Sequence, residues 1–163
     1  MFHFSEERDG LIVEVLRRPT VKGAIQSLDV TYLLHATEDA DKVAAAVRGL
    51  VGGEAPFESE EMEGHYGNGI KRVSVHLQGD QAAKAFAALT ASIPDGVRKE
   101  WARDIDKLVD EHSSLYLRFD KQMLVRGEIA PGYKDGVRLK IKPRIFLAHG
   151  RAAEFFLEWL KEG

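Results

Sequence analysis

The sequence has no cysteine among its 163 residues. This absence excludes disulfide bonds, thiolate nucleophiles and cysteine-ligated zinc, and it is compatible with a reducing cytoplasm. No apolar run approaches the ~20 residues that a membrane-spanning helix needs. The N-terminal residues also lack the basic region and the long apolar region of a signal peptide. We therefore expect a cytoplasmic protein that makes no contact with a membrane.

Motifs for catalysis and cofactor binding are also missing. The chain has no nucleophile elbow, no Gly-x-x-x-x-Gly-Lys-Ser/Thr loop and no Gly-x-Gly-x-x-Gly motif. Its 6 histidines are scattered, and Glu63 with His65 would supply too few ligands for a metal. We therefore predict no metal and no cofactor, and we expect a protein without catalytic activity. A nucleotide hydrolase remains an alternative that would need clustered carboxylates or a bound metal.

Charge is nearly balanced, with a formal net charge of -3. A basic site must therefore arise from segregation of cations onto one face, because the chain has no excess of them. The hydrophobic share of 44% and the charged share of 30% are ordinary for a globular protein. The length favours a single domain, residues 1–163, in which residues 1–20 form an N-terminal extension.

Periodicity predicts the secondary structure. Alternation of apolar and polar residues predicts strands at 25–35, 71–78, 115–120 and 137–144. The acidic segment 57–63 is interpreted as an edge strand or an extended arm. Helical spacing predicts helices over 37–50, 80–92, 95–108 and 148–163, the first capped by Thr37. The order is β-α-β-β-α-α-β-β-α. The apolar run at 11–16 before it could be a short strand or a helix, and its β-branched residues favour a strand. We predict an α+β fold, a two-layer α/β sandwich with a mostly antiparallel sheet.

The C-terminal helix has one strongly apolar face, formed by Phe155, Phe156 and Trp159 among others. This face either covers the sheet or makes a dimer contact, and we favour packing on the sheet.

The last predicted strand carries an unusual row of cations. Val137, Leu139 and Ile141 share one face, so the other face holds the cations, which no acid interrupts: Arg138, Lys140, Lys142 and Arg144. Such residues lie roughly 6.5–7 Å apart, a spacing similar to that of neighbouring phosphates in a nucleic acid. A solvated strand face is the ordinary explanation of such a row, and a phosphate-binding surface is the sharper one.

Further residues would enlarge this basic surface if the strands are neighbours. The candidates are Lys71, Arg72, Arg118 and Lys121. His65 and Asn68 could donate hydrogen bonds to a phosphate or a base, and Tyr66 and Tyr116 could stack on bases. Cations gathered on one flank of an acidic protein are typical of nucleic-acid binding.

Three motifs add a family resemblance: His35-Ala36-Thr37-Glu38-Asp39, Glu63-Gly64-His65-Tyr66-Gly67-Asn68 and Leu115-Tyr116-Leu117-Arg118-Phe119-Asp120-Lys121-Gln122. Their order and spacing over about residues 21–144 resemble the archaeal RNA-binding proteins predicted to be exosome-associated. The resemblance implies a two-layer α/β fold similar to a ribosomal 5S-RNA-binding protein. It also implies RNA binding without catalysis, and exosome subunits as partners.

Our main hypothesis is a non-catalytic RNA-binding protein, an accessory factor of RNA processing or degradation. It would hold the phosphates of structured or single-stranded RNA on a basic sheet face. The alternative is a protein-interaction or oligomerisation subunit, a homodimer among the options, which uses the C-terminal helix or the acidic segment 54–63 as its contact.

Overall fold

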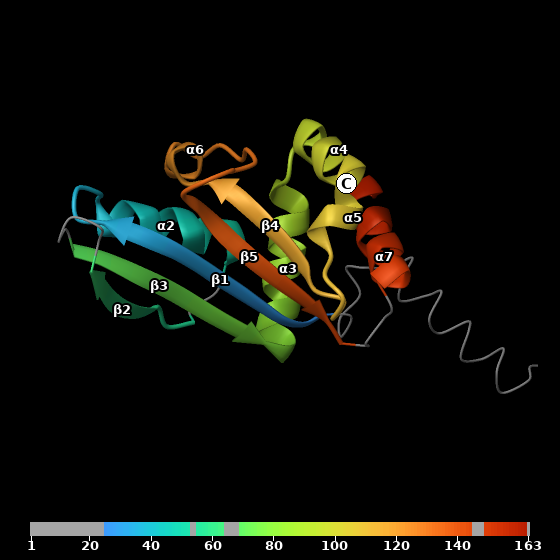
Figure 1. Ribbon diagram of the computed structural model, residues 1–163, viewed down its shortest axis with the longest axis horizontal. Coiled ribbons are helices and arrows are strands. Elements are labelled where there is room, and N and C mark those ends of the chain that lie inside the picture. Colours follow the sequence, from blue (N-terminus) through green and yellow to red (C-terminus); the bar gives the residue numbers. More distant parts are fainter. Residues whose placement is uncertain (1–24, 53–54, 64–68, 145–148, 163) are drawn as a thin grey trace, which may run out of the picture.

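The computed structural model describes residues 25–52, 55–63, 69–144 and 149–162 (Figure 1). The apolar run at 11–16 and three of the candidate RNA-binding residues, His65, Tyr66 and Asn68, lie outside the described residues.

A five-stranded antiparallel sheet organises the described residues. Its strands are β1 (Ile25–His35), β2 (Glu58–Glu63), β3 (Gly69–Gln78), β4 (Leu115–Asp120) and β5 (Gly136–Pro143). Their order across the sheet is β2-β3-β1-β5-β4, and all neighbouring pairs are antiparallel. The predicted α+β fold with an antiparallel sheet is therefore confirmed, and β4 and β5 are neighbours as the basic-surface hypothesis requires.

The helices are α2 (Ala40–Val51), α3 (Gly79–Ser92), α4 (Asp95–Arg103), α5 (Ile105–Leu108), α6 (Lys121–Val125) and α7 (His149–Lys161). The single helix expected over 95–108 is interrupted at Asp104, whose ψ of 16° lies outside the helical range. The segment 121–125, which is ambiguous in sequence but compatible with a short helical turn, forms α6. None of the described helices has the length and apolar character needed to cross a membrane.

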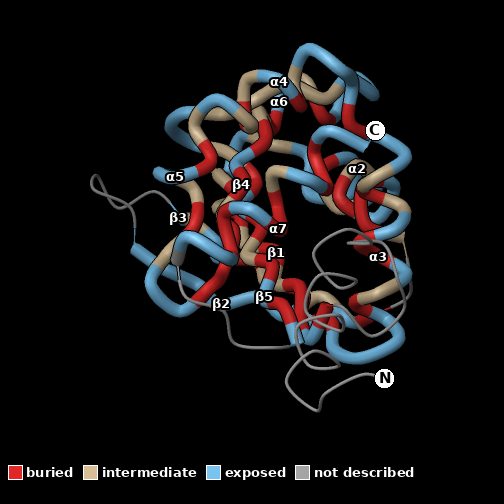
Figure 2. Tube along the Cα trace, turned by 90° about the vertical axis from the view of Figure 1, so that its right-hand side faces the viewer, coloured by how far each residue is buried: buried red, intermediate tan, exposed pale blue. Residues whose placement is uncertain are grey.

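Helices cover one face of the sheet and leave the other open. In Figure 1, α2 and α3 lie behind the sheet, and the strand residues that face them are buried, among them Val30, Leu117 and Leu139. Figure 2 shows the buried stretches along the strands and along the inner sides of the helices. Apolar alternation thus sets which side chains of each strand reach the solvent on the open face.

Helix α7 packs within the chain. It contacts α4 and α5, and Phe155, Phe156 and Trp159 are each 0% exposed. The Trp159 ring stacks on Phe86 of α3, with the ring centroids 4.6 Å apart. The alternative of a dimer contact through these aromatic residues is therefore wrong, because no part of their side chains reaches the surface. The preferred alternative, packing on the sheet, is right that this face is buried within the chain, but the main contacts of α7 are with helices and not with the sheet.

Two aspartates cap helices. The Asp39 carboxylate accepts hydrogen bonds from the Asp41 and Lys42 amides at 3.1 and 3.2 Å, so the N-cap of α2 is Asp39 and the predicted Thr37 cap is wrong. Asp120 accepts from the Met123 amide at 2.9 Å and caps α6. Each cap satisfies amides that the first helical turn leaves without a partner.

Candidate nucleic-acid interface

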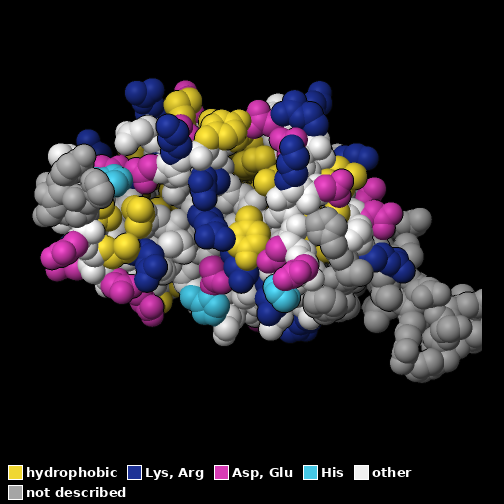
Figure 3. All heavy atoms as spheres, viewed as in Figure 1, with side chains coloured by type: hydrophobic (Ala, Val, Ile, Leu, Met, Phe, Trp, Pro, Cys, Tyr) yellow, Lys and Arg dark blue, Asp and Glu magenta, His cyan; other side chains and the backbone are white. Residues whose placement is uncertain are grey.

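Four cations form a row along the open face of β4 and β5. We call Arg118, Arg138, Lys140 and Lys142 the cationic row. Arg118 lies opposite Arg138, and Tyr116 lies opposite Lys140; Arg118, Arg138 and Lys142 are exposed and Lys140 is half-buried. Figure 3 shows Lys and Arg side chains gathered in a column over these two strands. Arg144, also exposed, follows just after the end of β5.

The cationic row has one acid beside it on the sheet, because Asp29 of β1 lies opposite Lys140. Among the described residues, no ion pair involves any of its four members. The Arg118 guanidinium donates only to main-chain carbonyls, those of Tyr133 and Lys134, at 3.4 and 3.3 Å. These interactions orient the side chain and leave its full charge available to an anionic ligand.

Tyr116 supports the middle of the row. The Arg138 guanidinium carbon lies 4.7 Å from the Tyr116 ring centroid, and the Lys140 ammonium lies 5.8 Å from it. A cation over an aromatic face is held by the ring quadrupole. The Tyr116 hydroxyl in turn hydrogen-bonds to the Asp110 carboxylate. Two cations therefore lie beside a ring that is itself anchored.

The anchoring carboxylate has a lowered pKa. Burial alone would raise the pKa of Asp110, but hydrogen bonds from the Ser114 amide, the Tyr116 hydroxyl and the His112 amide outweigh burial and lower it. Asp110 accepts from the His112 and Ser114 amides at 2.9 Å each, which shapes the turn that leads into β4. It is therefore ionised at neutral pH.

The opposite edge of the open face is acidic. Glu60 on β2 forms an ion pair with Arg72 at 2.5 Å. Asp29, which pairs with His76, is not at this edge but on the central strand β1. All six residues of β2 are exposed, and Figure 3 shows acidic side chains over this edge. Arg72 is on the open face as predicted, but its charge is already matched by Glu60. The face is thus polarised, positive over β4 and β5 and negative over β2.

Lys71 lies on the other side of the sheet. It shares the parity of the buried Val73 and Val75, and it stands opposite Glu61 of β2. It is exposed, but strand geometry separates it from the cationic row.

Lys121 does not extend the surface. Its side chain is 2% exposed, and its ammonium donates to the Leu33 carbonyl at 2.7 Å, Glu38 at 2.9 Å and Asp135 at 3.0 Å. The predicted contact with RNA is wrong for this residue, because the charge is buried and has three partners. It joins α6 to β1 and to the start of α2.

The cluster around Lys121 also contains three side chains of types that bind metal ions. His35, Glu38 and Asp135 could together offer three ligand atoms, and His35 lies 2.9 Å from the Asp135 carboxylate. The Lys121 ammonium already bonds to both carboxylates. A lysine side chain therefore supplies the positive charge that a metal would bring, and the cluster has a structural explanation.

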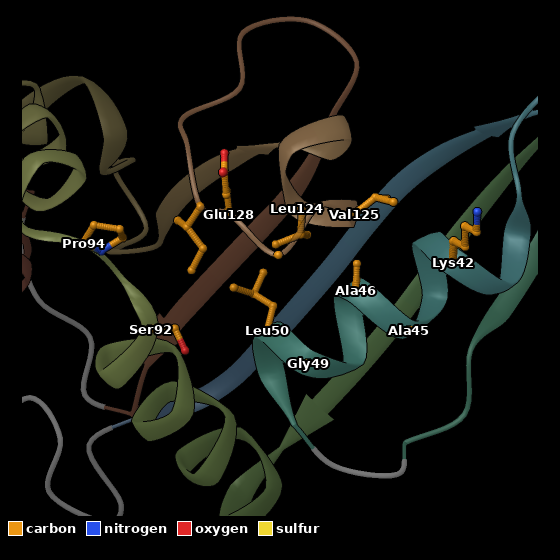
Figure 4. A pocket seen from close by; sticks show the side chains of 12 residues that line it. Lys42, Ala45, Ala46, Gly49, Leu50, Ser92, Pro94, Leu124, Val125 and Glu128 are labelled. Carbon is orange, nitrogen blue, oxygen red and sulfur yellow. The ribbon is translucent and has the colours of Figure 1, made fainter.

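A wide hollow lies on the helical side of the sheet. Its volume is about 1180 Å³, and it separates α2 from α6 and the segment 127–129. Figure 4 shows Leu50, Leu124 and Val125 around it, with Ala46 on α2. Few polar groups converge there, so it offers little for chemistry on a substrate.

Sequence reasoning missed Tyr133, which lies between α6 and β5 and is 77% exposed. Its hydroxyl donates to Glu100 at 3.1 Å, and its carbonyl accepts from Arg118. The loop pattern around it, Ala-Pro-Gly-Tyr-Lys, gave no periodicity that could have indicated a fixed aromatic side chain.

Comparison with known proteins identifies a family. A family model described as RNA binding matches residues 27–143. The chain belongs to this RNA-binding family. The matched region begins within β1 and ends with β5, so it contains the cationic row and nearly all of the sheet.

Individual relatives of the family are archaeal. The chain is 29% identical over 143 residues to RNA-binding protein PAB1135 of Pyrococcus abyssi, and the alignment covers 83% of this chain and 93% of the relative. It resembles the solved structure of Mth689, a DUF54 protein from Methanothermobacter thermautotrophicus, with a TM-score of 0.72 and 28% identity over 84% of this chain and 98% of the other. A second solved structure, AF2318 from Archaeoglobus fulgidus, has a TM-score of 0.70 and 26% sequence identity, and the match covers 83% of this chain and 99% of the other.

Two of the family-like motifs meet in the fold. Glu38 of the first motif accepts from the Lys121 ammonium at 2.9 Å and from the Gln122 amide at 3.4 Å, both from the third motif. It also accepts from the His35 main-chain amide at 2.9 Å. These motif residues therefore maintain the fold, and the side chains available to a ligand are their neighbours on the open face.

Proposed function

We propose that the cationic row binds the phosphates of RNA, so that the RNA backbone follows β4 and β5 along the open face. The observation that carries the proposal is four cations on adjacent strands, without an acidic partner among the described residues, in a chain of the RNA-binding family. Contacts to phosphate provide affinity and orientation, with little sequence preference.

The polarity of the face supports one path for the RNA. Glu60 and the other exposed acids of β2 would repel a polyanion, so the RNA would avoid that edge of the sheet. Arg144 extends the line of cations beyond the end of β5. An accessory role in RNA processing or degradation, together with exosome subunits, is the biological setting that the family resemblance suggests for this binding.

The experiment compares two double variants in an RNA filter-binding titration. Lys140→Ala/Lys142→Ala removes two cations of the row, and Lys42→Ala/Lys84→Ala removes two exposed cations of α2 and α3 with the same change in net charge. We expect the first pair to weaken RNA binding at least tenfold and the second to leave it within about twofold. Equal effects of the two pairs would contradict a localised site.

A protein-contact role has one observation in its favour. The edge strand β2 is exposed along its whole length, and Met62 is 40% exposed. An unpaired edge can accept a strand from a partner, and its glutamates would favour a basic one. Co-purification that survives nuclease treatment and is lost in a Glu58→Lys/Glu60→Lys variant would support this second role.

A further inference from the structure

A small hollow adjoins the cationic row at the β4 edge of the sheet. It has a volume of about 280 Å³ and lies between α4, the loop 131–133 and β4. Three of its lining residues, Tyr116, Arg118 and Arg138, also form the open face described above. Trp101 and Tyr133 add two more aromatic rings. The volume is just below the range of ligand pockets, roughly 300–1,000 Å³, and suits a single planar ring system.

Both tyrosines of the hollow are held by carboxylates. The Tyr133 hydroxyl donates to Glu100 at 3.1 Å, and this hydrogen bond raises the pKa of Tyr133. The Tyr116 hydroxyl bonds to Asp110. A solvent-exposed ring held in one position loses little rotamer freedom when a ligand stacks on it. Tyr133 is therefore arranged in advance as a stacking surface.

The loop that carries Tyr133 is attached to the sheet. The Asp120 amide donates to the Ala130 carbonyl at 2.8 Å, and the Gly132 amide donates to the Arg118 carbonyl at 2.8 Å. A Cβ atom on Gly132 would lie 2.7 Å from the Phe119 main chain, so only glycine allows this close approach. The position of Tyr133 relative to β4 is thus set by main-chain contacts.

The charged side chains around the hollow determine which chemical groups can enter it. Arg118 and Arg138 lie on the side of the cationic row, whereas Glu100 and Asp104 line the side of α4. The carboxylates would repel a phosphate, but they can accept hydrogen bonds from the amino groups of nucleobases. A nucleotide would therefore place its phosphate on the row and its base in the hollow.

We propose that this hollow binds one unpaired RNA base, stacked on Tyr133, while the adjoining phosphates lie on the cationic row. The inference rests on the proposed function and specifies its substrate as RNA that is single-stranded at this position. Bases within a duplex are already stacked and paired, so they cannot enter.

The test measures binding of a short unstructured RNA, and of the same RNA annealed to its complement, by fluorescence anisotropy. Tyr133→Ala should weaken binding of the single strand by about five- to 150-fold, the contribution of one stacked base, and leave duplex binding unchanged. Tyr133→Phe keeps the ring but loses the hydrogen bond to Glu100, so its affinity for the single strand should lie between those of Tyr133→Ala and the wild type. Removal of so exposed a ring leaves no cavity in the core.

The charge variant Lys140→Ala/Lys142→Ala in the same assay separates the two proposals. If it weakens binding of both RNAs while Tyr133→Ala binds the single strand like the wild type, the base site is wrong and phosphate binding stands. If Tyr133→Ala weakens both RNAs equally, the base site is also wrong, since unpaired bases would then have no special role. If the charge variant binds both RNAs normally, the proposed function itself fails.

Discussion

At the scale of single residues, cationic side chains have three different roles in this protein. Lys140 is on the open face without an acidic partner among the described residues, Arg72 shares its charge with Glu60, and Lys121 is buried between two carboxylates. Parity predicted the first, because a strand alternates strictly. Nothing local to Lys121 indicates that its ammonium reaches the Leu33 carbonyl, 88 residues away in sequence.

Lys121→Met should therefore affect stability and not RNA binding. The substitution leaves Glu38 and Asp135 without their cation, and loss of one partner of a buried ion pair costs about 3–5 kcal/mol. Partial exposure of Asp135, at 43%, places the expected loss near the lower end. Urea denaturation gives the free energy of unfolding. Lys142→Met, on the surface, is the control and should change it by less than about 0.5 kcal/mol. An equal effect of the two substitutions would contradict the structural role.

Asp110 makes stability depend on pH. Its pKa is lowered in the folded protein, so the carboxylate stabilises the fold above its ordinary pKa of about 4, and this contribution is lost as the pH falls through the lowered value. Asp110→Asn should cost about 1–3 kcal/mol at pH 7. Thermal unfolding from pH 7 down to pH 3 should show the difference from wild type shrinking below about pH 4. A difference that stays constant over this range would contradict the assignment.

At the scale of secondary structure elements, Arg98 joins two helix ends. Its guanidinium donates to the Ile93 carbonyl at 3.0 Å and to the Trp159 and Leu160 carbonyls at 3.3 and 3.4 Å, as well as to Thr90. Burial lowers the pKa of Arg98, and nearby Asp95 opposes the shift. The C-terminal carbonyls of α3 and α7 therefore share one cation, which suits the negative ends of both helix dipoles.

Arg98→Met should loosen α7. The change leaves several buried carbonyls without a donor and should cost about 2–4 kcal/mol. Hydrogen exchange of the α7 amides should rise in this variant. Arg103→Met, a surface cation of the same helix α4, provides the matched control and should leave exchange in α7 unchanged. Unaltered α7 protection in Arg98→Met would show that aromatic packing alone holds the helix.

The strands and the longer helices were easier to predict from the sequence than their ends and the segments that connect them. Alternation located β1, β3, β4 and β5 because each has one buried face, whereas the fully exposed β2 was recognised as an acidic edge strand. The break at Asp104 and the short helix α6 arise from packing that spans the chain, so periodicity did not indicate them. Tyr133 lies in a connection of this kind, and its fixed position depends on Gly132 lying against the main chain of β4.

Gly132→Ala tests that connection. The added methyl group would meet the Phe119 carbonyl at 2.7 Å, so the loop must move away from β4, at a cost of about 1–3 kcal/mol. We expect weaker binding of single-stranded RNA with the duplex affinity retained, as for Tyr133→Ala. Gly127→Ala in the same loop region is a poor control because its φ is 83°; Ala130→Gly, which leaves the space at Gly132 unchanged, is the better one.

At the scale of the whole molecule, the distribution of charge matters more than its total. The chain has a net charge of -3, yet the open face carries cations over β4 and β5 and acids over β2. Long-range repulsion from the rest of the protein would slow the approach of RNA, while the local field of the row would hold it. Binding of this kind depends strongly on salt.

The most direct test of the central claim is the salt dependence of RNA affinity for wild type and for the triple variant Arg138→Ala/Lys140→Ala/Lys142→Ala. Each phosphate contact with a single strand contributes about 0.7 to the slope of log affinity against log salt concentration. The account predicts that the triple variant lowers this slope by about two while the protein remains folded. A slope identical to that of the wild type would contradict phosphate binding by the cationic row.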